Sequence, residues 1–120
     1  MPDTGPGGAA LSAEDAKIVT LARSARARTR AAEGAAVRDL DGRTYAGATV
    51  ALASLQLSAV AVAVAMAVSS AARGLEAVAL VTGSDSATDA DLAAVRDLAG
   101  TAVPVLRCGP DGTVLERLST

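Results

Sequence analysis

Histidine, phenylalanine and tryptophan are absent from this chain, and cysteine and tyrosine occur once each, as Cys108 and Tyr45. A single cysteine excludes a disulfide framework within the chain, and with no histidine it also excludes a zinc site of the usual cysteine and histidine donors. Every mechanism that uses a histidine base is excluded for the same reason. A single aromatic ring excludes a base-stacking platform for nucleic acid and an aromatic cage.

Positive charge is scarce as well, because 11 Lys and Arg residues stand against 13 Asp and Glu residues, for a formal net charge of -2. The resulting pI near 4.9 argues against a general nucleic-acid-binding protein. The first ten residues have neither the basic region nor the apolar region of a signal peptide. We therefore expect a cytoplasmic protein.

Residues 44–72 carry no charge, and a stretch of that length would reach across a bilayer. Its richest apolar run, residues 57–68, is shorter than the roughly 20 residues that a membrane helix needs. The stretch also contains Gly47, Gln56 and several Ser and Thr residues. We therefore expect a buried core element in this part of the chain and no contact with a membrane.

The length of the chain predicts a single domain. We expect residues 1–10, which are rich in proline and glycine, to form a flexible tail, and residues 11–120 to form the domain. Alanine fills a quarter of the chain, so each residue buries little apolar area and the core should be small. Stability should therefore depend in part on a subunit interface.

Residues 11–32 predict a helix, which Ser12 can cap with Asp15 three positions later. Four arginines lie near the end of this helix. They can form a solvated face that suits the C-terminal end of the helix dipole, which is the interpretation we favour. They can also form a contact patch for an anion or RNA, for which Arg23, Arg26 and Arg30 are the candidate residues.

The remaining elements follow from turn residues and apolar periodicity. The pair Asp41-Gly42 lies between two short extended runs and predicts a β-hairpin with strands at 35–40 and 43–48. Residues 57–68 largely alternate valine with alanine, which fits a strand, but the length of the run favours a helix. Further strands are predicted at 75–82, 102–107 and 113–117, with a helix that Thr88 caps and Gly100 ends. Strands that alternate with helices indicate an α/β domain.

Two local strings and this order of elements resemble the small homo-oligomeric cytidine deaminases, over residues 13–118. Residues 34–36 read Gly-Ala-Ala, and residues 41–47 read Asp-Gly-Arg-Thr-Tyr-Ala-Gly, which matches the hairpin pattern Asp-Gly-Arg-x-Tyr-x-Gly of that family. The resemblance implies a three-layer α/β fold, with a central mixed sheet of about five strands and helices on both faces. It also implies self-association as a homodimer or a homotetramer.

The functional positions of that family do not keep their residue types in this chain. The family binds zinc through a Cys or His and a Cys-x-x-Cys pair, moves a proton with a Glu, and holds the ribose with an Asn and a Glu. The matching positions here are Val60 and Val62 for the first ligand and the proton shuttle, Thr88 and Asp91 for the cysteine pair, and Thr49 and Ala51 for the ribose contacts. Valine can neither lower the pKa of a bound water nor carry its proton. We therefore expect no residue of the usual catalytic mechanism, no zinc and no other cofactor.

Two other kinds of chemistry have candidate residues. Asp85, Asp89 and Asp91 offer the oxygen ligands that Mg2+ or Ca2+ takes, although loop solubility and the charge preference of a helix N-terminus explain them better. Cys108 has no histidine to activate it, so we expect a buried thiol rather than a nucleophile.

Two hypotheses for function remain. The first is a catalytically inactive relative of the deaminases that acts as an oligomeric scaffold or as a module that binds another protein. The alternative is a binder of a nucleoside or nucleotide, or a zinc-independent enzyme, that uses the remaining cleft with polar groups such as Arg43, Thr49 and Thr88. A cleft lined by valine and alanine would favour the first hypothesis, and a polar cavity with convergent donors would favour the second.

Overall fold

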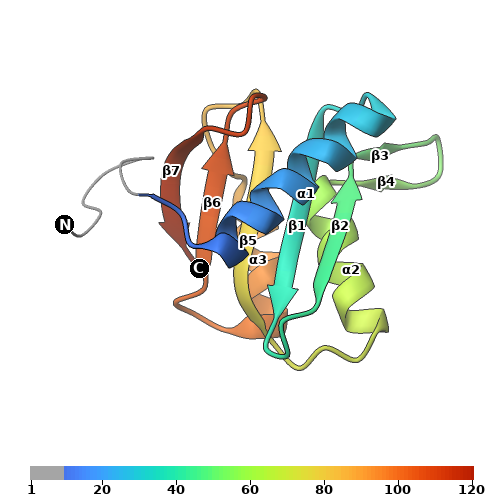
Figure 1. Ribbon diagram of the computed structural model, residues 1–120. Coiled ribbons are helices and arrows are strands. Elements are labelled where there is room, and N and C mark those ends of the chain that lie inside the picture. The colour runs from blue at the N-terminus through green and yellow to red at the C-terminus, as the bar shows by residue number, and fades with distance from the viewer. Residues whose placement is uncertain (1–9) are drawn as a thin grey trace.

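A mixed sheet of five strands forms the centre of the structure, a computed structural model that describes residues 10–120 (Figure 1). The strand order is β2-β1-β5-β6-β7, in which β5 and β6 run parallel and the other neighbours run antiparallel. The expected α/β fold with a mixed central sheet is confirmed, whereas the tail expected at 1–10 lies outside the described residues except for Ala10. The strands are β1 (Glu33–Asp39), β2 (Thr44–Ala48), β5 (Leu75–Thr82), β6 (Pro104–Cys108) and β7 (Val114–Ser119).

Helices cover both faces of this sheet and complete the three expected layers (Figure 1). The helices are α1 (Ala13–Thr29), α2 (Ala59–Ser69) and α3 (Asp89–Ala99). Ile18 of α1 is buried in one apolar cluster with Ala79 of β5, on one face of the sheet. Val64 of α2 and Val95 of α3 are buried with Leu80 in a second cluster, on the other face. Because side chains alternate between the faces of a strand, the central strand β5 supplies residues to both clusters and is apolar from Ala77 to Val81.

Two helices begin at the capping residues that the sequence predicts, Ser12 and Thr88, and α2 begins after Ser58. The hydroxyls of Ser12, Ser58 and Thr88 each accept a hydrogen bond from the backbone N–H three positions later, at 3.0–3.1 Å. The first helix ends at Thr29, earlier than the predicted residue 32, because Arg30 adopts a left-handed conformation with φ 55° and turns the chain into β1. β1 consequently starts at Glu33, two residues before the predicted strand, and this shift brings Glu33 into the sheet.

Two glycines allow the helices to approach the sheet closely. A Cβ atom at Gly34 would lie 2.1 Å from the carbonyl oxygen of Ala22 on α1, and a Cβ atom at Gly47 would lie 2.6 Å from Val62 on α2. The layers are therefore held together by close backbone contact as well as by the small alanine and valine side chains between them.

The valine- and alanine-rich helix α2 is buried on one side and exposed on the other. Ala63 and Ala67 are fully buried, but Met66 and Val68 are 42% and 54% exposed. The sequence predicted a buried core element here, and the structure buries one face of the helix.

A small hairpin between β2 and α2 was not predicted from the sequence. It consists of β3 (Val50–Ala51) and β4 (Gln56–Leu57), which pair antiparallel and extend away from the central sheet (Figure 1). Leu52 and Leu55 connect the two strands and are 61% and 48% exposed. This hairpin forms one wall of the cleft described below. Within residues 10–120 the structure has no helix long and apolar enough to cross a membrane.

Candidate functional site

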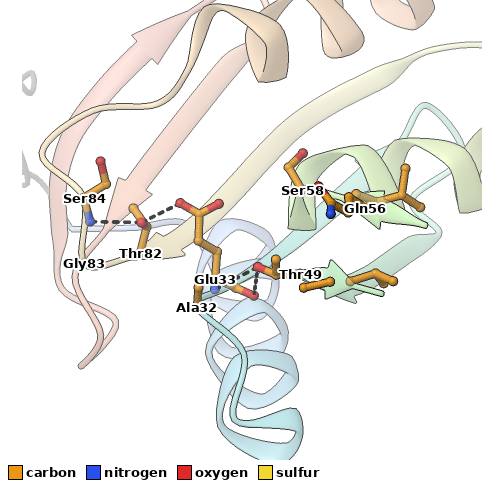
Figure 2. Close-up of a pocket in the computed structure, with 11 residues that line it drawn as sticks. Ala32, Glu33, Thr49, Gln56, Ser58, Thr82, Gly83 and Ser84 are labelled. Atoms are coloured by element: carbon orange, nitrogen blue, oxygen red, sulfur yellow. Dashed lines mark hydrogen bonds between the residues drawn. The ribbon is translucent and has the colours of Figure 1, made fainter. Parts of the chain in front are cut away.

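A cleft of about 600 Å³ opens where the start of β1, the β3–β4 hairpin, the start of α2 and the end of β5 meet (Figure 2). The sheet topology brings these segments together, because β1 begins beside the end of its antiparallel neighbour β5. The hairpin supplies apolar surface through Val50, Ala51 and Leu57. The polar lining consists of Glu33, Thr49, Gln56, Ser58, Thr82 and Ser84.

The carboxylate of Glu33 is held in place within the cleft by a chain of hydrogen bonds. The hydroxyl of Thr82 donates to Oε2 of Glu33 at 2.6 Å and accepts a hydrogen bond from the backbone N–H of Ser84 at 3.0 Å. Thr82 itself is 2% exposed, so this contact is shielded from water. Figure 2 shows the Glu33 carboxylate between this strand end and the start of α2, which carries Ser58. The cleft therefore contains an oriented negative charge.

Thr49, which the resemblance assigns to a ribose contact, lies in the cleft but directs its hydroxyl at the main chain. The N–H of Glu33 donates to Oγ1 of Thr49 at 3.0 Å, and that hydroxyl donates back to the carbonyl oxygen of Glu33 at 3.3 Å. The N–H of Thr49 also donates to the same carbonyl at 3.1 Å. Thr49 thus fixes the chain after β2 against the start of β1. Ala51, the other ribose position, lines the cleft without a polar group.

A second polar contact joins the starts of α2 and α3. The hydroxyl of Ser58 donates to Oδ1 of Asp91 at 2.6 Å and accepts from the N–H of Ala61. Asp91 is 5% exposed, and its own N–H donates to the hydroxyl of Thr88. Negative charge suits the first turn of a helix, so this carboxylate is stabilised by its position as well as by Ser58.

The other positions that match the family's zinc site by resemblance supply no polar side chain to the cleft. Val60 is 2% exposed and belongs to the core under the sheet, and Val62 is half-buried beside Gly47. Thr88 is exposed, as are Asp85 and Asp89. In the described part of the chain, no three acidic or cysteine side chains come close enough together to hold a metal ion.

Of the polar residues expected in a cleft, the structure brings only Thr49 there. Arg43 is exposed at the far end of β1, in the β1–β2 turn, and Thr88 caps α3 outside the lining. The residues that carry the polarity instead are Glu33, Ser58 and Thr82, which the sequence analysis did not select. Ser58 had a signal, because it precedes the helix as a capping residue. Glu33 and Thr82 had none, because they are 49 positions apart and meet through strand pairing.

Of the three arginines proposed as an anion patch, Arg23 and Arg26 lie on α1, on the other face of the sheet, and Arg30 directly follows the helix. Nε of Arg26 donates to the carbonyl oxygen of Ala32 at 3.1 Å, so this side chain ties the helix end to the following loop. Arg23 is exposed near the turn of Asp111, whose pKa is lowered by hydrogen bonds from Thr113 and to a lesser degree by the charge of Arg23. Arg30 is exposed at the helix end.

Cys108 is fully buried at the end of β6, as expected. Its Sγ atom lies 3.7 Å from the carbonyl oxygen of Leu106. Burial raises the pKa of the thiol to about 11. A thiol in this state is a poor nucleophile, because the reactive form is the thiolate.

Comparisons with known proteins give one family, from a sequence profile, and one fold, from solved structures. A profile of the family described as cytidine deaminase-like matches residues 11–112. The cytidine deaminase from Burkholderia pseudomallei superposes with a TM-score of 0.74 at 20% identity, over 92% of this chain and 92% of that chain. The enzyme from Mycobacterium leprae gives a TM-score of 0.70 at 21% identity, over 91% and 94% of the two chains. A mutant of the cytidine deaminase from Mycobacterium tuberculosis gives 0.65 at 25% identity, over 74% and 81%. No curated protein matches the chain.

Proposed function

Because the chain belongs to the cytidine deaminase-like family, we propose that it keeps the family fold as a catalytically inactive protein that self-associates and acts as a scaffold. The observation that carries this proposal is the donor set around the starts of α2 and α3. A zinc ion in a protein takes thiolate, imidazole and carboxylate ligands in a tetrahedral arrangement. This region offers Ser58, Thr88 and Asp91 beside Val60 and Val62, and the carboxylate of Asp91 already accepts the hydroxyl of Ser58.

These residues do not fit the zinc that the resemblance implies. Asp91 is a single carboxylate, and valine supplies neither a ligand nor a proton carrier. Replacing polar site groups by valine is also consistent with a site that holds no metal, because buried polar groups without partners cost stability. Elemental analysis of the purified protein should find far less than one zinc per chain, and cytidine should not be converted to uridine. About one bound zinc per chain would overturn the proposal.

Self-association is supported by exposed apolar side chains on the β3–β4 hairpin and on α2. Leu52 and Leu55 of the hairpin and Met66 and Val68 of α2 are all between 42% and 61% exposed. The hairpin and α2 both lie on the right of Figure 1. Large apolar side chains exposed on a protein surface are candidates for an interface, and no charged residue occurs between positions 44 and 72 to oppose association.

The test is the mass of the protein in solution, measured by light scattering after size exclusion at micromolar concentration. We expect a dimer or a tetramer. Met66→Glu should shift the protein toward the monomer, because it places a charge in the apolar surface. Leu115→Glu is the matched control, since Leu115 is 44% exposed on β7, the edge strand at the other side of the sheet. A stable monomer in the unmodified protein would contradict the scaffold proposal.

A second candidate function, binding of a small molecule, is favoured by the cleft itself. Its volume of about 600 Å³ lies within the range of ligand sites, and it combines apolar surface with several hydroxyls and a carboxylate. The cleft lining contains no Lys or Arg side chain, so a neutral nucleoside suits it better than a nucleotide. A thermal-shift series with nucleosides and nucleotides tests this candidate. A ligand at a hundred times its Kd should stabilise the fold by about 2.7 kcal/mol.

A further inference from the structure

We propose that the cleft binds a small organic cation, an ammonium or amidinium group on a compact apolar body, through the carboxylate of Glu33. The proposal rests on the second candidate function and names the chemical class of its ligand. Glu33 is the ionisable side chain among the residues that line the cleft. No other acidic or basic side chain of residues 10–120 lines the cleft.

Glu33 takes no part in the ion pairs that join described residues. These pairs connect Arg38 with Asp15 and Glu76, and Arg107 with Glu116. Arg107 reaches the rim of the cleft, where its Nη1 donates to the carbonyl oxygen of Ser84 at 3.1 Å, but its Nε is paired with Glu116 at 2.9 Å. Glu33 therefore forms no ion pair with any residue in the described part of the chain.

The hydrogen bond from Thr82 fixes the direction of the Glu33 carboxylate. It occupies Oε2, and within residues 10–120 no protein group donates to Oε1. Because Thr82 is buried and is held in turn by the N–H of Ser84, the carboxylate keeps its orientation toward the cleft (Figure 2). A fixed carboxylate oxygen in a partly buried site gains most from a charged N–H donor, since such hydrogen bonds are about twice as strong as neutral ones.

The opposite wall of the cleft determines the rest of the ligand. Val50, Ala51 and Leu57 offer apolar surface, and Gln56 and Ser58 offer polar groups beside it. A cavity of about 600 Å³ has room for a six-membered ring that carries one cationic group. An anionic ligand, such as a phosphate ester, would face the Glu33 carboxylate and find no basic side chain in the lining.

The test compares three probes of nearly equal size that differ in charge: benzamidine, benzamide and benzoate. Calorimetric and NMR titrations of the full chain should show benzamidine binding at least about tenfold more tightly than benzamide, and benzoate not binding, as expected for a charge-assisted hydrogen bond. The amide signals of Thr82 and Ser84 should move on addition of benzamidine.

Glu33→Gln should reduce benzamidine affinity at least about tenfold and leave benzamide affinity within about threefold, because glutamine keeps an acceptor for Thr82 but loses the charge. Glu14→Gln is the matched control, since Glu14 is exposed in the first turn of α1 on the other face of the sheet. It should leave all three affinities unchanged. Thr82→Val retains the charge and removes its orientation, and it should weaken benzamidine binding severalfold.

Failure of the cationic ligand and failure of the cleft as a small-molecule site would give different results. Equal affinities for benzamidine and benzamide, with no effect of Glu33→Gln, would overturn the cationic ligand while leaving the cleft as a binding site. Benzamidine signals confined to residues outside the cleft would overturn the inference as well. If neither the three probes nor the nucleosides bind the cleft, both the inference and the second candidate function fail.

Discussion

The phenolic hydroxyl of Tyr45 donates a hydrogen bond to Oδ2 of Asp39 at 2.9 Å. The other carboxylate oxygen of Asp39 accepts the backbone N–H groups of Asp41 and Arg43, also at 2.9 Å. Asp39 and Glu33 are the last and first residues of β1, so this strand carries one oriented carboxylate at each end. The carboxylate of Asp39 closes the β1–β2 turn, whereas that of Glu33 faces the cleft.

The closed turn predicts a loss of stability in acid. Burial would raise the pKa of Asp39, but the hydrogen bonds from Tyr45 and from the N–H groups of Arg43 and Asp41 outweigh it and lower the pKa. A group with a lowered pKa stabilises the fold above its unfolded pKa, about 3.9 for Asp, and this contribution disappears as the pH falls through the folded pKa.

Asp39→Asn should therefore melt at a lower temperature than the unmodified protein at pH 7, and the difference should shrink as the pH is lowered toward 3. Thermal melts of both proteins across this range provide the measurement. A difference in Tm that stays constant with pH would show that the charge of Asp39 contributes nothing to stability.

The same contact makes a second prediction about Tyr45. The hydrogen bond to Asp39, with a smaller contribution from burial, raises the pKa of the phenol above its ordinary value of 10.0. Because Tyr45 is the sole tyrosine and the chain lacks tryptophan, its ionisation can be followed directly by ultraviolet absorbance. We expect an apparent pKa above 10 in the folded protein and a lower value in Asp39→Asn. Identical titration curves for the two proteins would contradict the contact.

The buried thiol predicts low reactivity for Cys108. With its pKa raised to about 11, Cys108 is almost fully protonated at pH 8 in the folded protein, and the surrounding strands also block access. Its reaction with a disulfide reagent should be at least about a hundredfold slower than in the protein unfolded by guanidinium, where the pKa returns to about 8.5. Rapid modification under native conditions would mean that the end of β6 opens easily.

The close approach of α1 to β1 predicts a large difference between two glycine substitutions. Gly34→Ala places a methyl group against the backbone of Ala22 and Arg26, which cannot move without displacing the helix, so it should cost about 1–3 kcal/mol or more. Gly83→Ala adds the same group where no atom lies within 4 Å, and it should change stability by less than about 0.5 kcal/mol. Denaturant titrations of both variants provide the comparison. Equal stability of the two would contradict the packing of α1 on β1.

Local signals in the sequence were sufficient for most of the fold. The caps Ser12 and Thr88, the stop at Gly100 and the apolar run at 75–82 each depend on neighbouring residues, and the structure has these features where they were predicted. The β3–β4 hairpin was missed because each of its strands has two residues, too few for a periodic pattern.

The site was harder to predict than the fold, because its contacts are long-range. Glu33 meets Thr82, and Ser58 meets Asp91, across 49 and 33 positions. The family resemblance directed attention to the positions that match the family's zinc and ribose contacts, of which the ribose positions Thr49 and Ala51 line the cleft. Glu33 has no counterpart among those positions. Its place in the cleft follows from the pairing of β1 with β5, which sets Glu33 opposite Thr82.

Ser58 provides the last prediction, because it has two roles that a single comparison can separate. As the capping residue of α2 it resembles Ser12 of α1, and the loss of either cap should cost about 1 kcal/mol. Ser58 also donates to the buried carboxylate of Asp91, which would remain without this partner in Ser58→Ala, at an additional cost of about 1–3 kcal/mol. Ser58→Ala should therefore destabilise the fold more than Ser12→Ala. Removing the carboxylate as well, in Ser58→Ala with Asp91→Ala, should cost less than the sum of the two single substitutions. Additive costs would show that the contact between α2 and α3 does not contribute to stability.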